Sequence, residues 1–179
     1  MIRIKRVKRI AVAVKDLDAA VENWKRLFGI IPFMEGDEPE DKYRYVAFQI
    51  GNTFGEGDMT IEFLSPMDDP DGTMLIGKFI REKGEGLYMI TLETEGTSDE
   101  VDKELEELGF ESSWGGQLKH WGEKSEKGFT DKFGFESWTE HYINPKNANG
   151  VLVTLASIIY PKERSVFRAK PGITLRAKK

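Results

Sequence analysis

The chain repeats its own pattern halfway along its length. When the 179-residue sequence is displaced by 80 residues, the stretch VKRIAVAV (7–14) falls on LYMITLET (87–94), and Gly29 falls on Gly109. In each copy an alternating apolar stretch is followed by a short polar turn and an amphipathic stretch that ends at glycine. A duplication of this kind predicts two similar units that associate, because each unit has a face that it cannot bury by itself.

Each copy predicts one helix and four strands. The helices are expected over residues 17–28 and 98–108, after first strands near 7–14 and 87–94. Three further strands are predicted in each copy, at 31–34, 43–50 and 59–64, and at 110–113, 137–143 and 151–156. A connecting helix is plausible over 73–83. The offset between the copies grows from 80 to 92 residues by their last strands, because the second copy holds a Gly- and Lys-rich insertion that includes His120.

The resulting fold class is α+β, with two βαβββ modules pairing into a cupped, barrel-like mixed sheet. We expect the first module over 1–70, a linker over 71–85, the second module over 86–158 and a C-terminal extension over 159–179, in one compact domain. A four-stranded sheet with one helix leaves its second face open, and pairing two such sheets closes these faces around a shared cavity. Strands one and four of both copies then direct four equivalent side chains into that cavity. These side chains are Arg9, Glu62, Met89 and Thr154.

Several phrases resemble one known family. The stretches RIAVAVKDLDAAVENWKRLFGI, IEFLSP, IGKFIREKGEGLYMITLE and NPKNANGVLV are similar to the vicinal oxygen chelate superfamily, and within it to the methylmalonyl-CoA epimerase and glyoxalase I branch. The resemblance implies a divalent metal held by His, Gln or Glu, His and Glu on strands one and four of each module. Those positions fall here on the four residues just named. Only Glu62 is a competent ligand, because arginine keeps its proton, methionine is a soft thioether and neutral threonine binds metals poorly. We therefore expect no metal and no other cofactor.

Arg9 brings a fixed positive charge to the position where the family holds its metal. It could pair with Glu62, or its forked donors could bind an anionic oxygen of a substrate. A purely structural ion pair is the simpler alternative. Met89, Thr154 and Tyr45 are expected to contact the substrate, although each could equally serve only as core packing.

Strand 137–143 offers two sets of polar side chains, and only one set can face the cavity. If Thr139, His141 and Ile143 face inward, His141 is the best general base in the chain, since its ordinary pKa lies near neutral pH. If Trp138, Glu140 and Tyr142 face inward, Glu140 and Tyr142 take its place. The sequence leaves both alternatives open.

Three functions are compatible with these residues. The first is a metal-independent isomerase or lyase that acts on a carbonyl compound or an acyl thioester, in which Arg9 holds the oxyanion and Glu62 or His141 takes a proton. The second is a non-catalytic protein that sequesters a small ligand in the same cavity. The third is a metal-dependent epimerase, which the loss of three of the four ligand positions disfavours.

Composition limits the partners. Net charge is −5, with basic residues concentrated at both ends, and no motif interleaves them with aromatic residues as nucleic-acid binding would require. No apolar run is long enough for a membrane span, and no secretory signal is expected. The absence of cysteine suits a reducing cytoplasm, which is the expected location. A small-molecule ligand and a homodimer are the expected partners.

Overall fold

A computed structural model describes residues 1–51, 59–110, 112–120, 135 and 137–160. Within these residues the chain is α+β, and its strands form one mixed sheet in the order β2-β3-β4-β1-β5-β8-β7-β6. The strands are β1 (Ile4–Ala13), β2 (Met34–Glu38), β3 (Tyr43–Ile50), β4 (Met59–Pro66), β5 (Gly86–Thr94), β6 (Ser112–His120), β7 (Ser137–Ile143) and β8 (Leu152–Ile159). The helices are α1 (Leu17–Phe28), α2 (Leu75–Lys83) and α3 (Ser98–Glu107).

The two copies meet along β1 and β5 at the centre of the sheet. These strands are antiparallel, and Ile10 lies opposite Ile90, which are equivalent residues of the two copies. β1 is parallel to β4 and β5 is parallel to β8, with Ala11 opposite Glu62 and Thr91 opposite Thr154. This matching register confirms the predicted pairing of two βαβββ units into a single mixed sheet.

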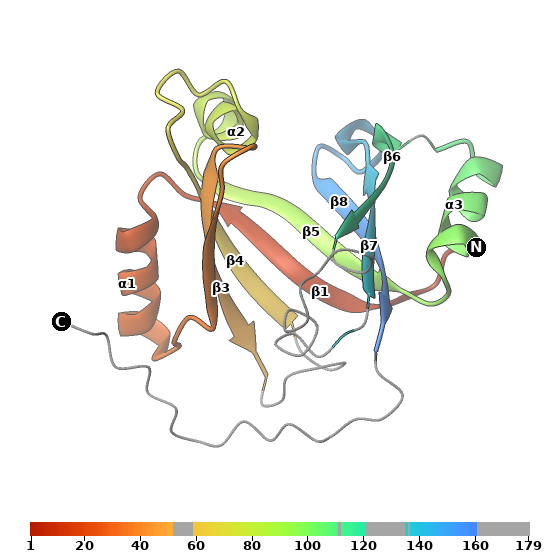
Figure 1. The fold of residues 1–179 in the computed structure, drawn as a ribbon, viewed down its shortest axis with the longest axis horizontal. Coiled ribbons are helices and arrows are strands. Elements are labelled where there is room, and N and C mark those ends of the chain that lie inside the picture. The colour runs from red at the N-terminus through yellow and green to blue at the C-terminus, as the bar shows by residue number, and fades with distance from the viewer. Residues whose placement is uncertain (52–58, 111, 121–134, 136, 161–179) are drawn as a thin grey trace.

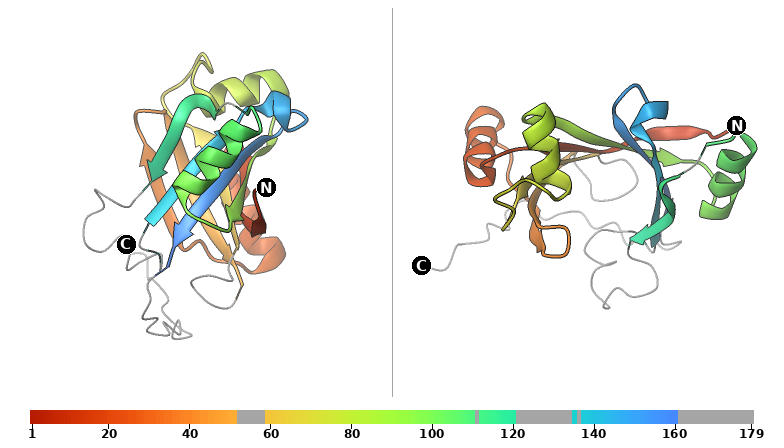
Figure 2. Two further views of the ribbon diagram at one scale, coloured as in Figure 1. Left: turned by 90° about the vertical axis from the view of Figure 1, so that its right-hand side faces the viewer. Right: turned by 90° about the horizontal axis from the view of Figure 1, so that it is seen from above.

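The sheet curls so that its two ends face each other (Figures 1 and 2). Seen from above in Figure 2, β1 and β5 form the base of a cup, and the remaining strands form its two arms. Helix α1 covers the outer face of the first arm through Leu17, which packs with Phe48 and Phe63. Helix α3 covers the outer face of the second arm, where Val101 and Leu105 pack with Leu155. The inner, concave face therefore stays free of α1 and α3.

Helix α2 lies on the inner side of the cup, at one end. Its Ile76 packs with Ala11, Leu64 and Met89 of the concave face. The helix begins at Leu75, two residues later than expected, because the Asp69 carboxylate accepts the backbone N–H groups of Thr73 and Met74 and holds them in a turn. α2 closes one end of the concave face.

The ends of α1 and α3 follow local sequence signals. The Asp16 side chain accepts the backbone N–H of Ala19 ahead of α1, and Gly29 ends this helix with a φ of 66°. Thr97 and Glu100 form a reciprocal capping box at the start of α3. Both helices therefore agree closely with the predicted ranges.

Several strands differ from the prediction. β1 begins at Ile4 rather than near residue 7, so Arg9 lies well inside the strand and not near its start. The strand is longer because the basic residues Lys5 and Arg6 both contact the buried carboxylate of Glu93 on β5. β2 lies at Met34–Glu38 rather than 31–34, since it pairs its polar residues with the start of β3. β6 runs to His120 and so takes up part of the insertion, while β8 continues to Ile159. The rest of the insertion, 121–134, and residues 161–179 of the expected extension lie outside the described residues, and the proposed module limits remain an expectation.

Candidate active site

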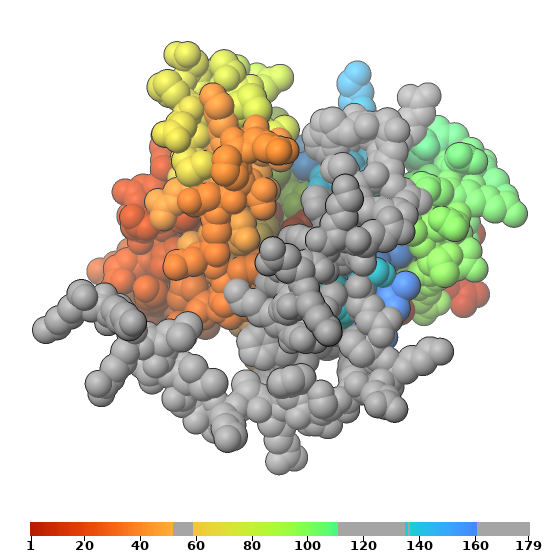
Figure 3. Space-filling view, viewed as in Figure 1, coloured from red at the N-terminus to blue at the C-terminus, as the bar shows by residue number. Residues whose placement is uncertain are grey.

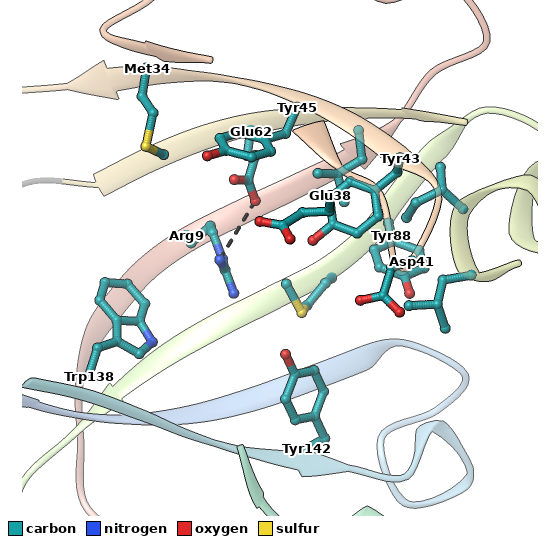
Figure 4. A pocket seen from close by; sticks show the side chains of 14 residues that line it. Arg9, Met34, Glu38, Asp41, Tyr43, Tyr45, Glu62, Tyr88, Trp138 and Tyr142 are labelled. Carbon is teal, nitrogen blue, oxygen red and sulfur yellow. Dashed lines mark ion pairs between the residues drawn. The ribbon is translucent and has the colours of Figure 1, made fainter. Parts of the chain in front are cut away.

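The concave face holds a cavity of about 520 Å³ between the two copies. In Figure 3 strand β3 of the first copy and helix α3 of the second copy lie on opposite sides of the molecule, and Figure 4 shows the cavity from close by. Polar and aromatic side chains from β1, β2, β3, β4, β5 and β7 line it. They are Arg9, Glu38, Asp41, Tyr43, Tyr45, Glu62, Tyr88, Trp138 and Tyr142, together with the apolar residues Met34, Leu64, Leu75, Ile76 and Met89.

Arg9 supplies a buried positive charge at the floor of the cavity. Its Nη2 donates to both carboxylate oxygens of Glu140, at 2.7 and 3.0 Å, and its Nε donates to Thr91 Oγ1 at 3.2 Å. Its Nη1 lies 3.7 Å from Glu62 Oε2. The guanidinium carbon lies 5.7 Å from the ring centre of Trp138. Burial disfavours the charge, but the carboxylates of Glu140 and Glu62 outweigh this effect and raise the pKa of Arg9. Arg9 is therefore permanently cationic.

A row of residues across four strands fixes the position of Glu140. Arg9 lies opposite Thr91, Thr91 opposite Thr154, and Thr154 opposite Tyr142. Thr154 Oγ1 donates to Thr91 Oγ1 at 2.8 Å, and the Tyr142 hydroxyl donates to Glu140 Oε2 at 3.2 Å. Glu140 and Thr154 are fully buried. The carboxylate that holds Arg9 thus comes from β7, whereas the family resemblance placed the fourth ligand on β8 at Thr154.

Glu62 faces the cavity from β4 and has few partners. It is 8% exposed, and within the described part of the chain its only polar contact is the 3.7 Å approach to Arg9. Burial raises the pKa of Glu62; Arg9 opposes this shift, and the nearby charges of Glu140 and Glu38 add to it. A carboxyl group with a raised pKa is a candidate for accepting and returning a proton.

Tyrosines form much of the remaining wall. Burial, helped by the charge of Asp41, raises the pKa of Tyr88 to about 12. Burial is also the main cause that raises the pKa values of Tyr43 and Tyr142, so these phenols remain neutral hydrogen-bonding groups at ordinary pH. Tyr45 packs its ring directly over Gly36 on the neighbouring strand, where an added Cβ would lie 2.6 Å from the Tyr45 hydroxyl oxygen. Gly36 therefore leaves the space that the Tyr45 ring occupies in the cavity wall.

His141 points away from the cavity. It is fully buried between β7 and α3, where Nε2 lies 3.1 Å from Ser98 Oγ and Nδ1 lies 2.9 Å from Asp102 Oδ1. The three residues have the order of a Ser–His–Asp array, but both Ser98 and Asp102 belong to the helix that covers the outer face. Burial lowers the pKa of His141, against the opposing effect of Asp102. The geometry therefore gives His141 a structural position, and of the two open alternatives the set with Glu140 and Tyr142 faces inward.

The other anticipated residues divide into two groups. Arg9, Glu62, Met89 and Tyr45 all line the cavity. Thr154 and Glu140 lie behind it and hold Arg9 in place. Sequence reasoning missed Glu38 and Asp41, because acidic residues beside a hairpin turn ordinarily indicate a solvated loop. It also missed Glu140 as the main partner of Arg9.

The residues at the family's metal position do not fit a metal ion. Arg9 carries a fixed positive charge there, Met89 offers only a soft thioether, and the Thr154 hydroxyl already donates to Thr91. No group of three or more His, Cys, Asp or Glu residues suited to a metal occurs among the described residues. The side chains at this position are therefore unsuited to a metal-assisted step.

Comparison with known proteins agrees with the fold. A sequence model of the glyoxalase/bleomycin resistance protein/dioxygenase superfamily matches residues 8–125, and the chain belongs to this superfamily. The ethylmalonyl-CoA/methylmalonyl-CoA epimerase of Cereibacter sphaeroides is 25% identical over 155 residues, which cover 87% of this chain and 99% of that protein.

Solved structures show the same fold. A Streptomyces coelicolor methylmalonyl-CoA epimerase variant in complex with 2-nitronate-propionyl-CoA has a TM-score of 0.66 and 22% identity, covering 86% of this chain and 94% of its own. A methylmalonyl-CoA epimerase in complex with methylmalonyl-CoA and NH4+ has a TM-score of 0.67 and 22% identity, covering 88% of this chain and 99% of its own. A hypothetical protein from Bacillus halodurans has a TM-score of 0.66 and 19% identity, covering 89% and 98% of the two chains.

Proposed function

We propose that the protein is a metal-independent isomerase, or a lyase with the same first step, that removes a proton from the carbon next to a carbonyl group. The substrate would be a small carbonyl compound or an acyl thioester. The observation that carries the proposal is Glu62, a buried carboxyl group with a raised pKa that faces the cavity beside Arg9. The similarity to epimerases that act on acyl-CoA thioesters supports the same class of reaction.

Each residue would have a distinct role. Glu62 takes the proton, the C–H electron pair moves into the adjacent bond, and the carbonyl oxygen becomes an enolate oxygen. Arg9 Nη1, which makes no hydrogen bond to a described residue, is the donor available to that oxygen. Glu140 and Thr91 orient the guanidinium through Nη2 and Nε. Delivery of a proton to the opposite face of the same carbon, or of the proton on Glu62 to a different atom of the enolate, completes an isomerisation. Loss of a leaving group from the enolate would instead make the reaction a lyase.

The test is proton exchange in D2O. Acyl-CoA thioesters and small ketones are incubated with the protein, and deuterium at the carbon next to the carbonyl is followed by NMR and mass spectrometry. Exchange with wild type should fall about 100-fold or more in Glu62→Gln, in the range found for general bases. Glu35→Gln is the matched control, because Glu35 is exposed on β2 and does not line the cavity. Equal exchange by Glu62→Gln and wild type would contradict the proposal.

A ligand-sequestering protein is the second candidate. It is favoured by the contact with Glu140 that already occupies Nη2 of Arg9, and by an aromatic wall made of Tyr43, Tyr45, Tyr88 and Trp138. Tight binding of a carbonyl compound with no deuterium exchange would support this function over the isomerase.

We also propose a homodimer in the cytoplasm. Leu27, Phe28 and Ile31 gather at the end of α1 with exposures of 66, 62 and 78%, which is unusual for apolar residues of a monomer. The lack of cysteine supports the location. No helix among the described residues combines the length and the apolar character needed to cross a membrane. Sedimentation of wild type and of Phe28→Glu tests the dimer: the variant should sediment as a monomer.

A further inference from the structure

The cavity contains more negative than positive charge. Three carboxylates line it, from Glu38, Asp41 and Glu62, and Arg9 is the only cationic side chain among its described lining residues. Arg9 is already bound by Glu140, which lies behind it. The guanidinium and Glu140 balance each other in charge, and Glu62 lies 3.7 Å from the same guanidinium, so Glu38 and Asp41 are the carboxylates of the cavity lining that no cation contacts among the described residues.

Glu38 and Asp41 have no basic partner within 4 Å in the described part of the chain. Glu38 is the last residue of β2, and Asp41 belongs to the turn that leads into β3. In Figure 4 the Glu38 carboxylate points toward the Arg9–Glu62 pair, and Asp41 lies beside Tyr88 on the side that faces Tyr142. Burial raises the pKa of Glu38, and the like charges of Asp41 and Glu40 add to the shift. These carboxylates repel one another in the empty site, and a cation between them would relieve the repulsion.

The walls between these carboxylates are aromatic. The rings of Tyr43, Tyr45 and Tyr88 line the same cavity and stay neutral at ordinary pH. The face of an aromatic ring attracts a cation, most strongly where water is excluded. Neutral rings next to unpaired carboxylates form the kind of surface that recognises an organic ammonium group.

An anionic ligand fits this cavity poorly. A carboxylate entering from the Glu38 and Asp41 side would meet two like charges before it reached Arg9. At Arg9 it would then compete with Glu140, both of whose carboxylate oxygens already accept from Nη2, and it would lie next to Glu62. Complementarity of charge therefore favours a cation and opposes a carboxylate.

We propose that the ligand of this cavity is a carbonyl compound that carries a positively charged ammonium group, with the ammonium held between Glu38, Asp41 and the tyrosine rings and the carbonyl directed to Arg9 and Glu62. The inference rests on the proposed function for the carbonyl group, and it adds the charge of the substrate. It separates this protein from the epimerases it is similar to, one of which is in complex with the anionic methylmalonyl-CoA.

Three probes of matched size test the proposal. The first is (2-oxopropyl)trimethylammonium, whose positive charge is independent of pH. The second is its neutral isostere 4,4-dimethylpentan-2-one, and the third is the anion acetoacetate. Dissociation constants are measured by ligand-observed NMR with wild type, Glu38→Gln, Asp41→Asn and the exposed control Glu35→Gln.

The cation should bind wild type about tenfold or more tightly than the isostere, the combined scale of cation–aromatic contacts and two nearby carboxylates. Glu38→Gln and Asp41→Asn should each weaken the cation several-fold, about the effect of one lost charge near a protein surface, and leave the isostere unchanged. The isostere thereby reports that each variant is folded. The inference would be overturned if the cation bound wild type no more tightly than the isostere, or if neither of them bound. Tighter binding of acetoacetate than of the cation would overturn it as well.

Deuterium exchange at the methylene group of the same probes separates this inference from the proposed function. Cation preference without exchange would keep the inference and reject the isomerase. Exchange in the neutral or anionic probe without cation preference would keep the isomerase and reject the inference.

Discussion

Arg9 Nη2 lies 2.7 and 3.0 Å from the two carboxylate oxygens of Glu140, although the two residues belong to strands separated by β5 and β8 in the sheet. The curl of the sheet brings β7 over β1 and makes this contact. The pair stands where relatives with the full ligand set would hold a metal. It leaves Glu62, the other carboxylate near Arg9, with only a 3.7 Å contact. The two carboxylates should therefore respond very differently to mutation.

Glu140→Gln should destabilise the fold by about 3–5 kcal/mol, because it leaves the buried Arg9 guanidinium without its closest counter-charge. Arg9→Met should cost a similar amount for the converse reason. The double variant Arg9→Met with Glu140→Gln should regain about half of the loss or more, since neither member of the pair is then left charged without the other. Urea denaturation of the four proteins provides the measurement. Additive losses in the double variant would show that the pair is not coupled.

Glu62→Gln should be as stable as wild type or more stable at neutral pH. The folded state raises the pKa of Glu62 above its ordinary value of 4.5, so the folded protein holds this proton more tightly than the unfolded chain. Wild type therefore loses stability from this group as pH rises from about 4.5 through the raised pKa, and the glutamine variant does not. Denaturation curves at several pH values should show that the free energy of unfolding of the variant increases relative to that of wild type across this pH range. A variant whose stability falls relative to wild type as pH rises would contradict the raised pKa of Glu62.

His141 should make the protein sensitive to mild acid. The folded state lowers the pKa of His141 below its ordinary value of 6.5, so the unfolded chain binds this proton more readily. The stability that neutral His141 contributes is complete above about pH 6.5 and is lost as pH falls through the lower folded value. In His141→Gln this part of the pH dependence should disappear, which thermal denaturation between pH 5 and 8 will detect. An unchanged pH profile would place the sensitivity elsewhere.

A metal site should be recoverable with two substitutions. Arg9→His together with Met89→His would place two imidazoles beside Glu62 and Glu140, a donor set that suits zinc and cobalt. Titration with Co2+ should give visible absorption bands of a tetrahedral or five-coordinate site in this double variant. Wild type and Met89→His alone, which both keep the Arg9 charge, should give none. Bands in the wild-type titration would show that Arg9 does not exclude metal.

Much of the fold could be predicted because its signals are local. Helices α1 and α3 are defined by capping residues, terminal glycines and amphipathic spacing. The duplication predicted that the two copies pair into one mixed sheet, and the structure shows this pairing as the antiparallel register of Ile10 with Ile90. The alignment of Glu62 with Thr154 also holds, since they lie opposite Ala11 and Thr91 at equivalent points of the two copies. β2 was misplaced because its polar residues form a strand only through pairing with β3.

The contacts of the site were harder to predict because they depend on the curl of the sheet. Alternation along β7 divides Glu140 from His141, but it does not say which side is concave. Glu140 lies on β7, which β5 and β8 separate from β1 in the sheet. It reaches Arg9 only because the two arms of the sheet bend toward each other. The acidic residues Glu38 and Asp41 carry no sequence signal that distinguishes a cavity wall from a solvated hairpin.

The central place of β1 has a consequence for how the chain folds during synthesis. β1 is translated before the other strands of the sheet, but Arg9 contacts Thr91 across 82 residues and Glu140 across 131 residues of sequence. Contacts at such separations form slowly, because the chain loses the entropy of closing a long loop before the contact can stabilise it. The cup can therefore be completed only after β7 has been translated. Until then Arg9 remains in water, and the nascent first copy presents an open sheet edge that a chaperone is well placed to cover.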